Sequence, residues 1–247
     1  MARPLDGKVA LVTGGSRSIG AAIAKRLAAD GAAVAITYNA SPGKAEAVVR
    51  AIEQAGGKAL AIEANAADAA AVRAAVTKTV KALGRLDVLV NNAGMAILKP
   101  VDDVSLEDFD RMIAVNVRGL FVAAQEAARH MGAGGRIINI GSINSDRVPF
   151  GGGSLYVLTK AAVAGLTKAL ARDLGPRGIT VNDVQPGPTA TDMNPDSGDF
   201  AAAARGYTAL GRYASVDEIA DFVAYLASPG ASYITGAGLA IDGGYGA

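Results

Sequence analysis

Seven short apolar segments alternate along the chain with longer stretches of helical character. The apolar segments are rich in β-branched residues and are bounded by turn-forming residues. They are Val9–Val12, Val34–Thr37, Ala59–Ile62, Val88–Val90, Arg136–Ile140, Ile179–Val184 and Leu239–Ile241. Near-continuous apolar runs of this length are typical of strands that are buried on both faces of a sheet.

The stretches between these segments are rich in Ala, Lys, Arg and Glu, and several of them end at a glycine. We expect helices at Ile19–Asp30, Pro42–Ala55, Asp68–Leu83, Leu106–Met131, Ser154–Leu174 and Val216–Leu226. Alternation of strand and helix predicts an α/β fold, in which right-handed crossovers cover both faces of a parallel sheet of about seven strands. Since no linker or repeat interrupts the pattern, residues 1–247 are expected to form one domain.

Composition excludes several classes of protein. Hydrophobic residues make up 51% of the chain and charged residues 19%, which excludes intrinsic disorder. The net charge of +1 leaves no basic surplus for binding nucleic acid. The chain has no cysteine and only one histidine, His130, so disulfides and thiolate metal sites are excluded. No metal site is predicted, because a His-rich zinc site needs more than one histidine.

Two segments bear on membranes and export. Phe222–Ile241 is the longest uncharged stretch, but Pro229 and Gly236 fall within it and break it into a helix end, a turn and a strand. Asp6 and Lys8 interrupt the apolar run near the N-terminus, so no signal peptide is predicted. We therefore expect a cytoplasmic protein with no membrane partner.

A glycine-rich loop, Thr13–Gly20, follows the first predicted strand and leads into a helix. Small residues let a backbone approach a pyrophosphate, and the free N–H groups at the start of the helix then point at that anion. The spacing is not a literal GxGxxG, so an ordinary glycine-rich turn is the alternative. We expect cofactor contacts from Gly14, Ser16, Arg17, Ser18, Ile19 and Gly20.

The end of the second predicted strand bears on the type of dinucleotide. NAD sites place an acid about 20 residues beyond the glycine-rich loop, where it binds the ribose 2′-hydroxyl. Here the strand ends in Tyr38, Asn39, Ala40 and Ser41, without an acid. Arg17 could pair with a 2′-phosphate, although a solvated surface arginine is the alternative. The missing acid and the arginine together favour NADP(H) over NAD(H).

Four further residues carry candidate chemistry. Tyr156 and Lys160 lie four residues apart in a predicted helix and share a face. A cation beside a phenol stabilises the phenolate, so such a tyrosine can exchange a proton near neutral pH; a plain surface pair is the alternative. Ser142 follows a predicted strand, at the edge where open α/β sheets bind ligands, although it could be a turn serine. Asn116 lies inside a predicted helix, where asparagine is mildly unfavourable.

Together these residues resemble the short-chain dehydrogenase/reductase family. The matching parts, in the family's order, are Thr13–Gly20, Asn91–Gly94, Asn116, Ser142, Tyr156 with Lys160, and Pro186-Gly187 with Thr191. The resemblance implies a single doubly wound Rossmann-type domain with a catalytic tetrad. In that tetrad Tyr156 is the acid/base and Ser142 positions the carbonyl. Lys160 tunes Tyr156 and holds the nicotinamide ribose, and Asn116 supports a proton relay through water.

The resemblance also implies cofactor contacts elsewhere in the chain. The implied residues are Ala64, Asn65, Ala66, Asn92, Ala93, Gly94, Val115, Tyr156, Lys160, Pro186, Gly187, Thr189 and Thr191. The sequence departs from the family pattern at a few places. Ser18 stands where Gly or Ala is usual, Asn65 where Asp is frequent, and the gap from Ser142 to Tyr156 is one residue longer than is commonest. Asp183 interrupts a predicted strand that is otherwise apolar.

The substrate is less readable. The chain resembles 3-oxoacyl-[acyl-carrier-protein] reductases and general carbonyl reductases about equally. An acidic carrier protein needs a basic dock, and the near-zero net charge favours a small ketone or aldehyde, with the acyl-carrier protein kept open. The segment 192–214 is expected to be a lid over the site, although a plain surface loop would look the same.

A different class of function is also open. Gln185–Pro188, Asp192–Pro195 and the ending Ile241–Ala247 resemble a subgroup that includes a cyclic-di-GMP-binding biofilm dispersal protein. In that reading the pocket binds a signalling nucleotide and turnover is incidental, a reading that the intact tetrad disfavours. The family is mostly tetrameric, so the resemblance implies a homotetramer.

Overall fold

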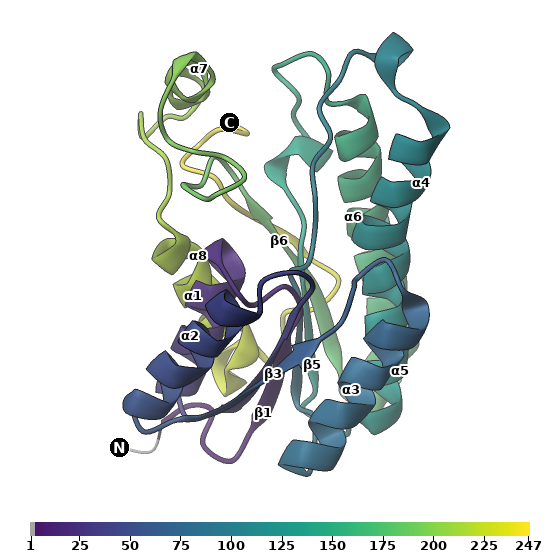
Figure 1. Ribbon diagram of the computed structural model, residues 1–247, viewed down its shortest axis with the longest axis vertical. Coiled ribbons are helices and arrows are strands. Elements are labelled where there is room, and N and C mark those ends of the chain that lie inside the picture. Colours follow the sequence, from purple (N-terminus) through teal and green to yellow (C-terminus); the bar gives the residue numbers. More distant parts are fainter. Residues whose placement is uncertain (1–2) are drawn as a thin grey trace.

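The computed structural model describes residues 3–247; residues 1 and 2, with which the expected domain begins, lie outside them. Seven parallel strands form one sheet in the order β3-β2-β1-β4-β5-β6-β7 (Figure 1). The strands are β1 Val9–Val12, β2 Ala33–Tyr38, β3 Lys58–Glu63, β4 Val88–Asn91, β5 Arg136–Ile140, β6 Thr180–Pro186 and β7 Gly238–Ile241. The predicted α/β fold with a parallel seven-stranded sheet is confirmed.

Helices cover both faces of this sheet (Figure 1). One face packs against α1 Ser18–Ala29, α2 Pro42–Gln54 and α8 Val216–Ala227. The other face packs against α3 Ala69–Leu83, α5 Leu120–His130 and α6 Ser154–Leu174. Every residue of β1, β4, β5 and β6 is buried, which is why these strands show no apolar–polar alternation, although β6 also buries several polar side chains.

The strand order places a crevice at one edge of the sheet. From β1 the chain moves outward through β2 to β3, and it then returns to β4 on the other side of β1. Connections therefore leave the carboxyl ends of β1 and β4 in opposite directions, which opens a space between them. Ligands in open α/β sheets bind at such a switch point.

One predicted helix is interrupted. The stretch Leu106–Met131 consists of α4 Leu106–Ile113, a wide π-helical turn η2 at Ala114–Gly119, and α5, which ends at His130. The turn passes close to the backbone beyond β3, since a Cβ on Gly119 would lie 2.2 Å from the carbonyl oxygen of Ala66. A π-turn of this kind often marks a functional site, and this one carries Asn116.

The other predicted bounds are met or differ by one or two residues. The difference at the start of α3 has a clear cause, because Asp68 is its N-cap and accepts hydrogen bonds from the N–H groups of Ala70 and Ala71 at 2.8 and 3.2 Å. A short helix that was not predicted, α7 Asp199–Gly206, lies within the segment 192–214. Across residues 3–247, we find no helix with the length and apolar character needed to cross a membrane.

Candidate active site

A cleft of about 820 Å³ opens at the carboxyl edge of the sheet, within the size range of small-molecule sites. Every cofactor residue expected from the sequence lines it, as do Ser142, Tyr156 and Lys160. These residues come from the carboxyl ends of β1 to β6 and the loops that follow them, from the start of α1, from the π-turn and from α6. Asn116, the fourth expected catalytic residue, is not among the lining residues and lies behind the wall.

The glycine-rich loop is tied to the turn after β4. The hydroxyl of Thr13 accepts hydrogen bonds from the N–H groups of Asn92 and Ala93, each at 3.0 Å. The side-chain amide of Asn92 donates back to the carbonyl oxygens of Thr13 and Gly14, also at 3.0 Å. A Cβ on Gly20 would lie 2.4 Å from the carbonyl oxygen of Gly14, so only glycine fits there. Asn92 is therefore a structural member of the loop as well as a cleft residue.

The start of α1 presents open N–H groups to the cleft. Arg17 is the N-cap of α1, and its side chain makes no capping hydrogen bond. Ser18, where the family usually has Gly or Ala, adopts a φ of +47°, which a residue with a Cβ adopts at some cost. Free amides at a helix start, reached over a loop of small residues, fit a pyrophosphate.

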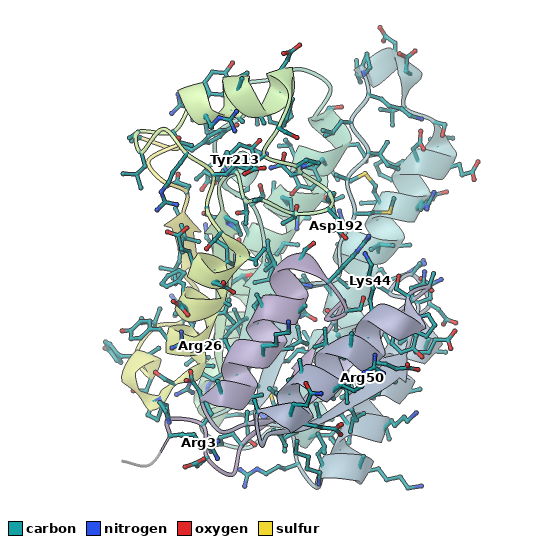
Figure 2. All side chains as sticks on the ribbon, turned by 60° about the vertical axis from the view of Figure 1, so that its left-hand side comes forward. Arg3, Arg26, Lys44, Arg50, Asp192 and Tyr213 are labelled. Carbon is teal, nitrogen blue, oxygen red and sulfur yellow. The ribbon has the colours of Figure 1, made fainter. Side chains whose placement is uncertain are left out.

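Two cations and one carboxylate meet at the outer end of the cleft. Asp192 Oδ2 lies 3.6 Å from the Arg17 guanidinium and 3.2 Å from the Lys44 ammonium. Figure 2 shows Lys44, from α2, directed towards Asp192, from the segment after β6. The N–H of Asp192 also donates to the Ser18 hydroxyl at 3.3 Å. Sequence reasoning missed Lys44, because nothing in a lysine at the start of an amphipathic helix sets it apart from other surface lysines.

The expected adenine end is built from small side chains. Ala64, Ala66 and Val115 line the cleft there. Asn65, where the family often has Asp, uses its side-chain oxygen to accept a hydrogen bond from the Ala67 N–H at 3.0 Å. This local turn contact accounts for an asparagine at the position as well as it would for an aspartate.

Tyr156 and Lys160 face each other from adjacent turns of α6, as their spacing predicted. The Lys160 ammonium lies 5.7 Å from the centroid of the Tyr156 ring. The ammonium is buried and donates to the carbonyl oxygen of Ile140 at 2.8 Å, which fixes it against the end of β5. Ser142, also buried, accepts a hydrogen bond from the Asn144 N–H at 3.2 Å, so its own O–H is free to donate into the cleft.

Asn116 holds the wall of the site together. Its side-chain oxygen accepts from the Met95 N–H at 2.9 Å, and its amide donates to the Met95 carbonyl at 2.9 Å and to the Thr159 hydroxyl at 3.1 Å. Thr159 precedes Lys160 on α6. The asparagine thus links the loop after β4 to the helix that carries Tyr156 and Lys160. Its expected part in a water relay stays a prediction.

The segment after β6 closes the cleft on its far side. Pro186 ends β6, and a Cβ on Gly187 would lie 2.6 Å from the Cα of Asp242, so the chain passes tightly beside the turn after β7. Thr189 pairs with Ala214 in an isolated bridge, which joins the two ends of the segment 192–214. That segment therefore leaves and returns at one place beside the cleft.

One end of the cleft is apolar. Five of its large side chains are Leu98, Phe150, Met193, Phe200 and Tyr245. Phe150 and Phe200 meet edge to face, with ring centroids 5.9 Å apart at 74°. Only the extra residue between Ser142 and Tyr156 hinted at this region in the sequence, because Phe150 lies in that loop. Among residues 3–247, no group of three or more His, Cys, Asp or Glu residues is placed to hold a metal ion.

Comparison with known proteins identifies the family. A family model described as Enoyl-(Acyl carrier protein) reductase matches residues 14–246. A short-chain dehydrogenase/reductase from Serratia marcescens BCRC 10948 is 62% identical, with a TM-score of 0.98 over 99% of this chain and 100% of that one. The chain belongs to the short-chain dehydrogenase/reductase family. This membership, predicted from the motifs, makes it an oxidoreductase by family.

Two other members bear on the choice of ligand. A short chain dehydrogenase from Burkholderia cenocepacia J2315, solved in complex with NADP, is 56% identical, with a TM-score of 0.98 over 99% of this chain and 100% of that one. The cyclic-di-GMP-binding biofilm dispersal mediator protein of Escherichia coli strain K12 is 44% identical over 241 residues, which is 98% of each chain. Both resemblances extend over almost the whole short-chain dehydrogenase/reductase fold described above.

Proposed function

We propose that the protein reduces a ketone or aldehyde to an alcohol with NADPH, and can run the reverse reaction with NADP⁺. The observation that carries this proposal is the Tyr156–Lys160 pair, with 5.7 Å between the ammonium and the ring centroid, in the same cleft as Ser142 and the glycine-rich loop. The NADP complex of the Burkholderia relative supports the choice of cofactor.

The phosphate end of the cleft supports the same cofactor. Arg17 and Lys44 both reach one anionic oxygen, that of Asp192, so the two cations can converge on a single phosphate group. The residues after β2 include no acid that would repel a 2′-phosphate or bind a 2′-hydroxyl. In this proposal Arg17 and Lys44 hold the 2′-phosphate, and the open amides of α1 hold the pyrophosphate.

Bound NADPH would supply the hydride that reduces the carbonyl carbon. Ser142 donates its free O–H to the carbonyl oxygen and stabilises the negative charge that develops there. Tyr156 then delivers its phenolic proton to that oxygen, which completes the alcohol. Lys160, fixed by the Ile140 carbonyl, keeps its positive charge beside the phenol and stabilises the phenolate that remains. Asn116 keeps α6 and the loop after β4 in register.

The apolar end of the cleft indicates the substrate class. Phe150 and Phe200, with Leu98 and Met193, favour a carbonyl compound that carries an aliphatic or aromatic group. A 3-oxoacyl thioester has such a chain and stays a candidate, although the balanced surface charge does not favour an acidic carrier protein. The segment 192–214 acts as the lid.

The deciding experiment is an NADPH-consumption screen over ketones, aldehydes, quinones and a 3-oxoacyl thioester. The proposal expects turnover with at least one class, and Tyr156→Phe is the matched control that keeps the ring but lacks the hydroxyl. Absence of turnover with every class, or equal turnover in the variant, would contradict it.

A second candidate function is binding of cyclic-di-GMP, which the Escherichia coli relative's name favours. Calorimetric titration with cyclic-di-GMP, with NADPH titrated in parallel, separates the two. Tight binding of cyclic-di-GMP without turnover in the screen would favour the second candidate. The complete set of Tyr156, Lys160 and Ser142 in the cleft favours the first.

We further propose that the protein acts in the cytoplasm as a homotetramer. Several large apolar side chains on the α4–α6 side are exposed in the single chain, among them Leu106, Phe121 and Leu158. Exposed apolar side chains grouped on one side are typical of subunit contacts. Light scattering coupled to size exclusion tests the oligomeric state, and a monomer at micromolar concentration would contradict it.

A further inference from the structure

A row of buried polar side chains crosses the sheet beneath the catalytic helix. Asn91 of β4, Asn139 of β5 and Asp183 of β6 are direct partners in register across three adjacent parallel strands. Their exposed fractions are 3%, 0% and 0%. The amide of Asn139 donates to the hydroxyl of Thr167 on α6 at 2.9 Å, so the row lies on the face that α6 covers.

Among the described residues, Asn139 is hydrogen-bonded through both its side-chain oxygen and its amide, whereas Asn91 Oδ1 and Asp183 Oδ1 have no partner, and only Asp183 is an acid. The Asn91 amide donates to the Asn139 side-chain oxygen at 2.9 Å. Within the part of the chain that the structure describes, Asp183 Oδ2 accepts one long hydrogen bond, from the Gln185 amide at 3.3 Å, and the backbone N–H of Gly141 adds a further favourable contact to the carboxyl group. Asp183 Oδ1 has no hydrogen-bond partner among residues 3–247. A fully buried carboxyl group normally has a paired cation or several donors, so this one calls for an explanation.

Asp183 lies directly against the strand end that carries the catalytic groups. A Cβ on Gly141 would lie 2.4 and 2.7 Å from the two carboxyl oxygens of Asp183, so the carboxyl group fills the space that this glycine leaves. Gly141 stands between Ile140, whose carbonyl holds the Lys160 ammonium, and Ser142. The carboxyl group therefore flanks the peptide that connects two parts of the proposed machinery.

The charges around Asp183 come from two elements. Lys160, on α6, favours the ionised carboxyl group, and Asp146, just beyond the turn η3 Ile143–Ser145, opposes it. Gln185 is neutral, the partner in β5 is Asn139 and the partner in β7 is Gly238, so the neighbouring strands add no charge in register. Burial outweighs the attraction of Lys160 and raises the pKa of Asp183 to about 7.

We propose that Asp183 is a positioning residue that acts through Lys160, and that its ionisation offsets part of the positive charge that Lys160 directs at Tyr156. The inference rests on the proposed acid/base role of Tyr156. A neutral Asp183 leaves the full field of Lys160 on the phenol. An ionised Asp183 weakens that field and makes loss of the phenolic proton harder.

The first test is the pH profile of kcat/KM for alcohol oxidation, in which Tyr156 must accept a proton. Asp183→Asn keeps the shape of the side chain but cannot ionise. The acidic limb of the kcat/KM profile of this variant should therefore move to lower pH by about half a unit or more, so that kcat/KM at a given pH on that limb rises by about threefold. Asp146→Asn removes an exposed acid from the same neighbourhood and should move the limb much less, because solvent screens it. Superimposable profiles for the wild type and Asp183→Asn would overturn the proposal.

The second test does not depend on turnover. In the cofactor-free protein, ¹³C NMR follows the Asp Cγ and Tyr Cζ signals with pH, and Asp183→Asn and Tyr156→Phe assign the two residues. We expect Asp183 to titrate near neutral pH and the Tyr156 midpoint to fall in Asp183→Asn. An unmoved Tyr156 midpoint would overturn the proposal. If Asp183→Asn does not fold, Asp183→Ser serves as the neutral variant.

The two tests separate this inference from the proposed function. If the Tyr156 midpoint moves in Asp183→Asn while Tyr156→Phe retains turnover, the coupling between the residues stands and the acid/base role of Tyr156 is wrong. If Tyr156→Phe is inactive, and Asp183→Asn moves neither the acidic limb of the kcat/KM profile nor the titration midpoint of Tyr156, the acid/base role of Tyr156 stands and the proposed role of Asp183 is wrong.

Discussion

A single hydroxyl carries the proposed chemistry at the residue scale. Tyr156 is placed by α6 and faces an ammonium that is itself held by the carbonyl of Ile140. Tyr156 and Lys160 lie on the long helix α6, and the carbonyl that holds Lys160 lies at the end of strand β5, so none of the three groups belongs to a loop. Groups on rigid elements hold a productive geometry better than groups on loops do.

Replacing Tyr156 with Phe removes the proton donor and leaves the packing almost unchanged. We expect kcat to fall by about 10²- to 10⁴-fold, the usual contribution of a general acid. NADPH affinity should stay near that of the wild type, which fluorescence titration measures. A parallel loss of cofactor binding would show that the phenol has a different task.

The two cations at the outer end of the cleft should discriminate between dinucleotides. We expect Arg17→Ala to weaken NADPH binding by about ten- to a hundredfold, because a charged hydrogen bond to phosphate is lost, and Lys44→Ala to weaken it by less. NADH binding should change little in either variant. Arg50→Ala, an exposed arginine farther along α2, is the control for general charge and should leave both affinities unchanged. Equal losses for both dinucleotides would refute this assignment.

At the scale of elements, the π-turn η2 is the feature that periodicity alone could not reveal. Its apolar pattern continues that of α4 and α5, so one helix over Leu106–Met131 was the natural prediction. What decides the wide turn is the close approach of Gly119 to the Ala66 carbonyl and the hydrogen bonds of Asn116 to Met95. Contacts between distant parts of the chain leave no trace in local hydrophobic spacing.

Gly119 and Gly165 offer a matched pair of helical glycines. A Cβ on Gly119 would strike the Ala66 carbonyl at 2.2 Å, whereas a Cβ on Gly165 in α6 meets nothing within 4 Å. We expect Gly119→Ala to destabilise the protein by about 1–3 kcal/mol through overpacking. Gly165→Ala should stabilise it by about 0.5–1 kcal/mol through helix propensity. Urea unfolding midpoints check both, and equal effects of the two variants would contradict the close approach at Gly119.

The residues expected in the site could be named from the sequence, and those of the apolar end could not. Thr13–Gly20, Ser142 and the Tyr156–Lys160 pair each follow a local rule about strand ends, loops or helix faces, the family resemblance joined them into one expected site, and the structure places them in one cleft. Phe150 and Phe200 meet because two loops fold over one another, and such loops follow no periodic pattern. Residues that line a site only through tertiary packing therefore stay invisible until the fold is known.

At the scale of the whole molecule, a parallel sheet with two covered faces leaves little room for charge in its interior. Asp183 is an exception, fully buried on β6, the strand next to the edge strand β7. In the sequence it interrupts a predicted strand that is otherwise apolar. Its surroundings depend on Gly141, the residue that follows the neighbouring strand β5, so its role emerges only from strand order and register.

The buried carboxyl group should make the stability of the fold depend on pH. The pKa of Asp183 is raised from 3.8 to about 7 in the folded chain, so the native state holds a proton that the unfolded state has already lost. The free energy of unfolding therefore falls by up to about 4 kcal/mol as the pH rises from about 4 through 7. Asp183→Asn should flatten that part of the curve, which Tm values measured from pH 5 to 8 would show. A wild-type curve parallel to that of the variant would contradict the raised pKa.

Asp192 links the segment after β6 to the two elements that follow β1 and β2. Its side chain contacts Arg17 and Lys44 and its N–H donates to Ser18, while the next residue, Met193, lines the cleft. An incoming phosphate group must compete with this carboxylate for the same two cations. If Arg17 and Lys44 bind the 2′-phosphate as proposed, cofactor binding would replace the ion pairs that tie Asp192 to the loop after β1 and to α2, and the start of the segment 192–214 would keep fewer contacts with that side of the cleft.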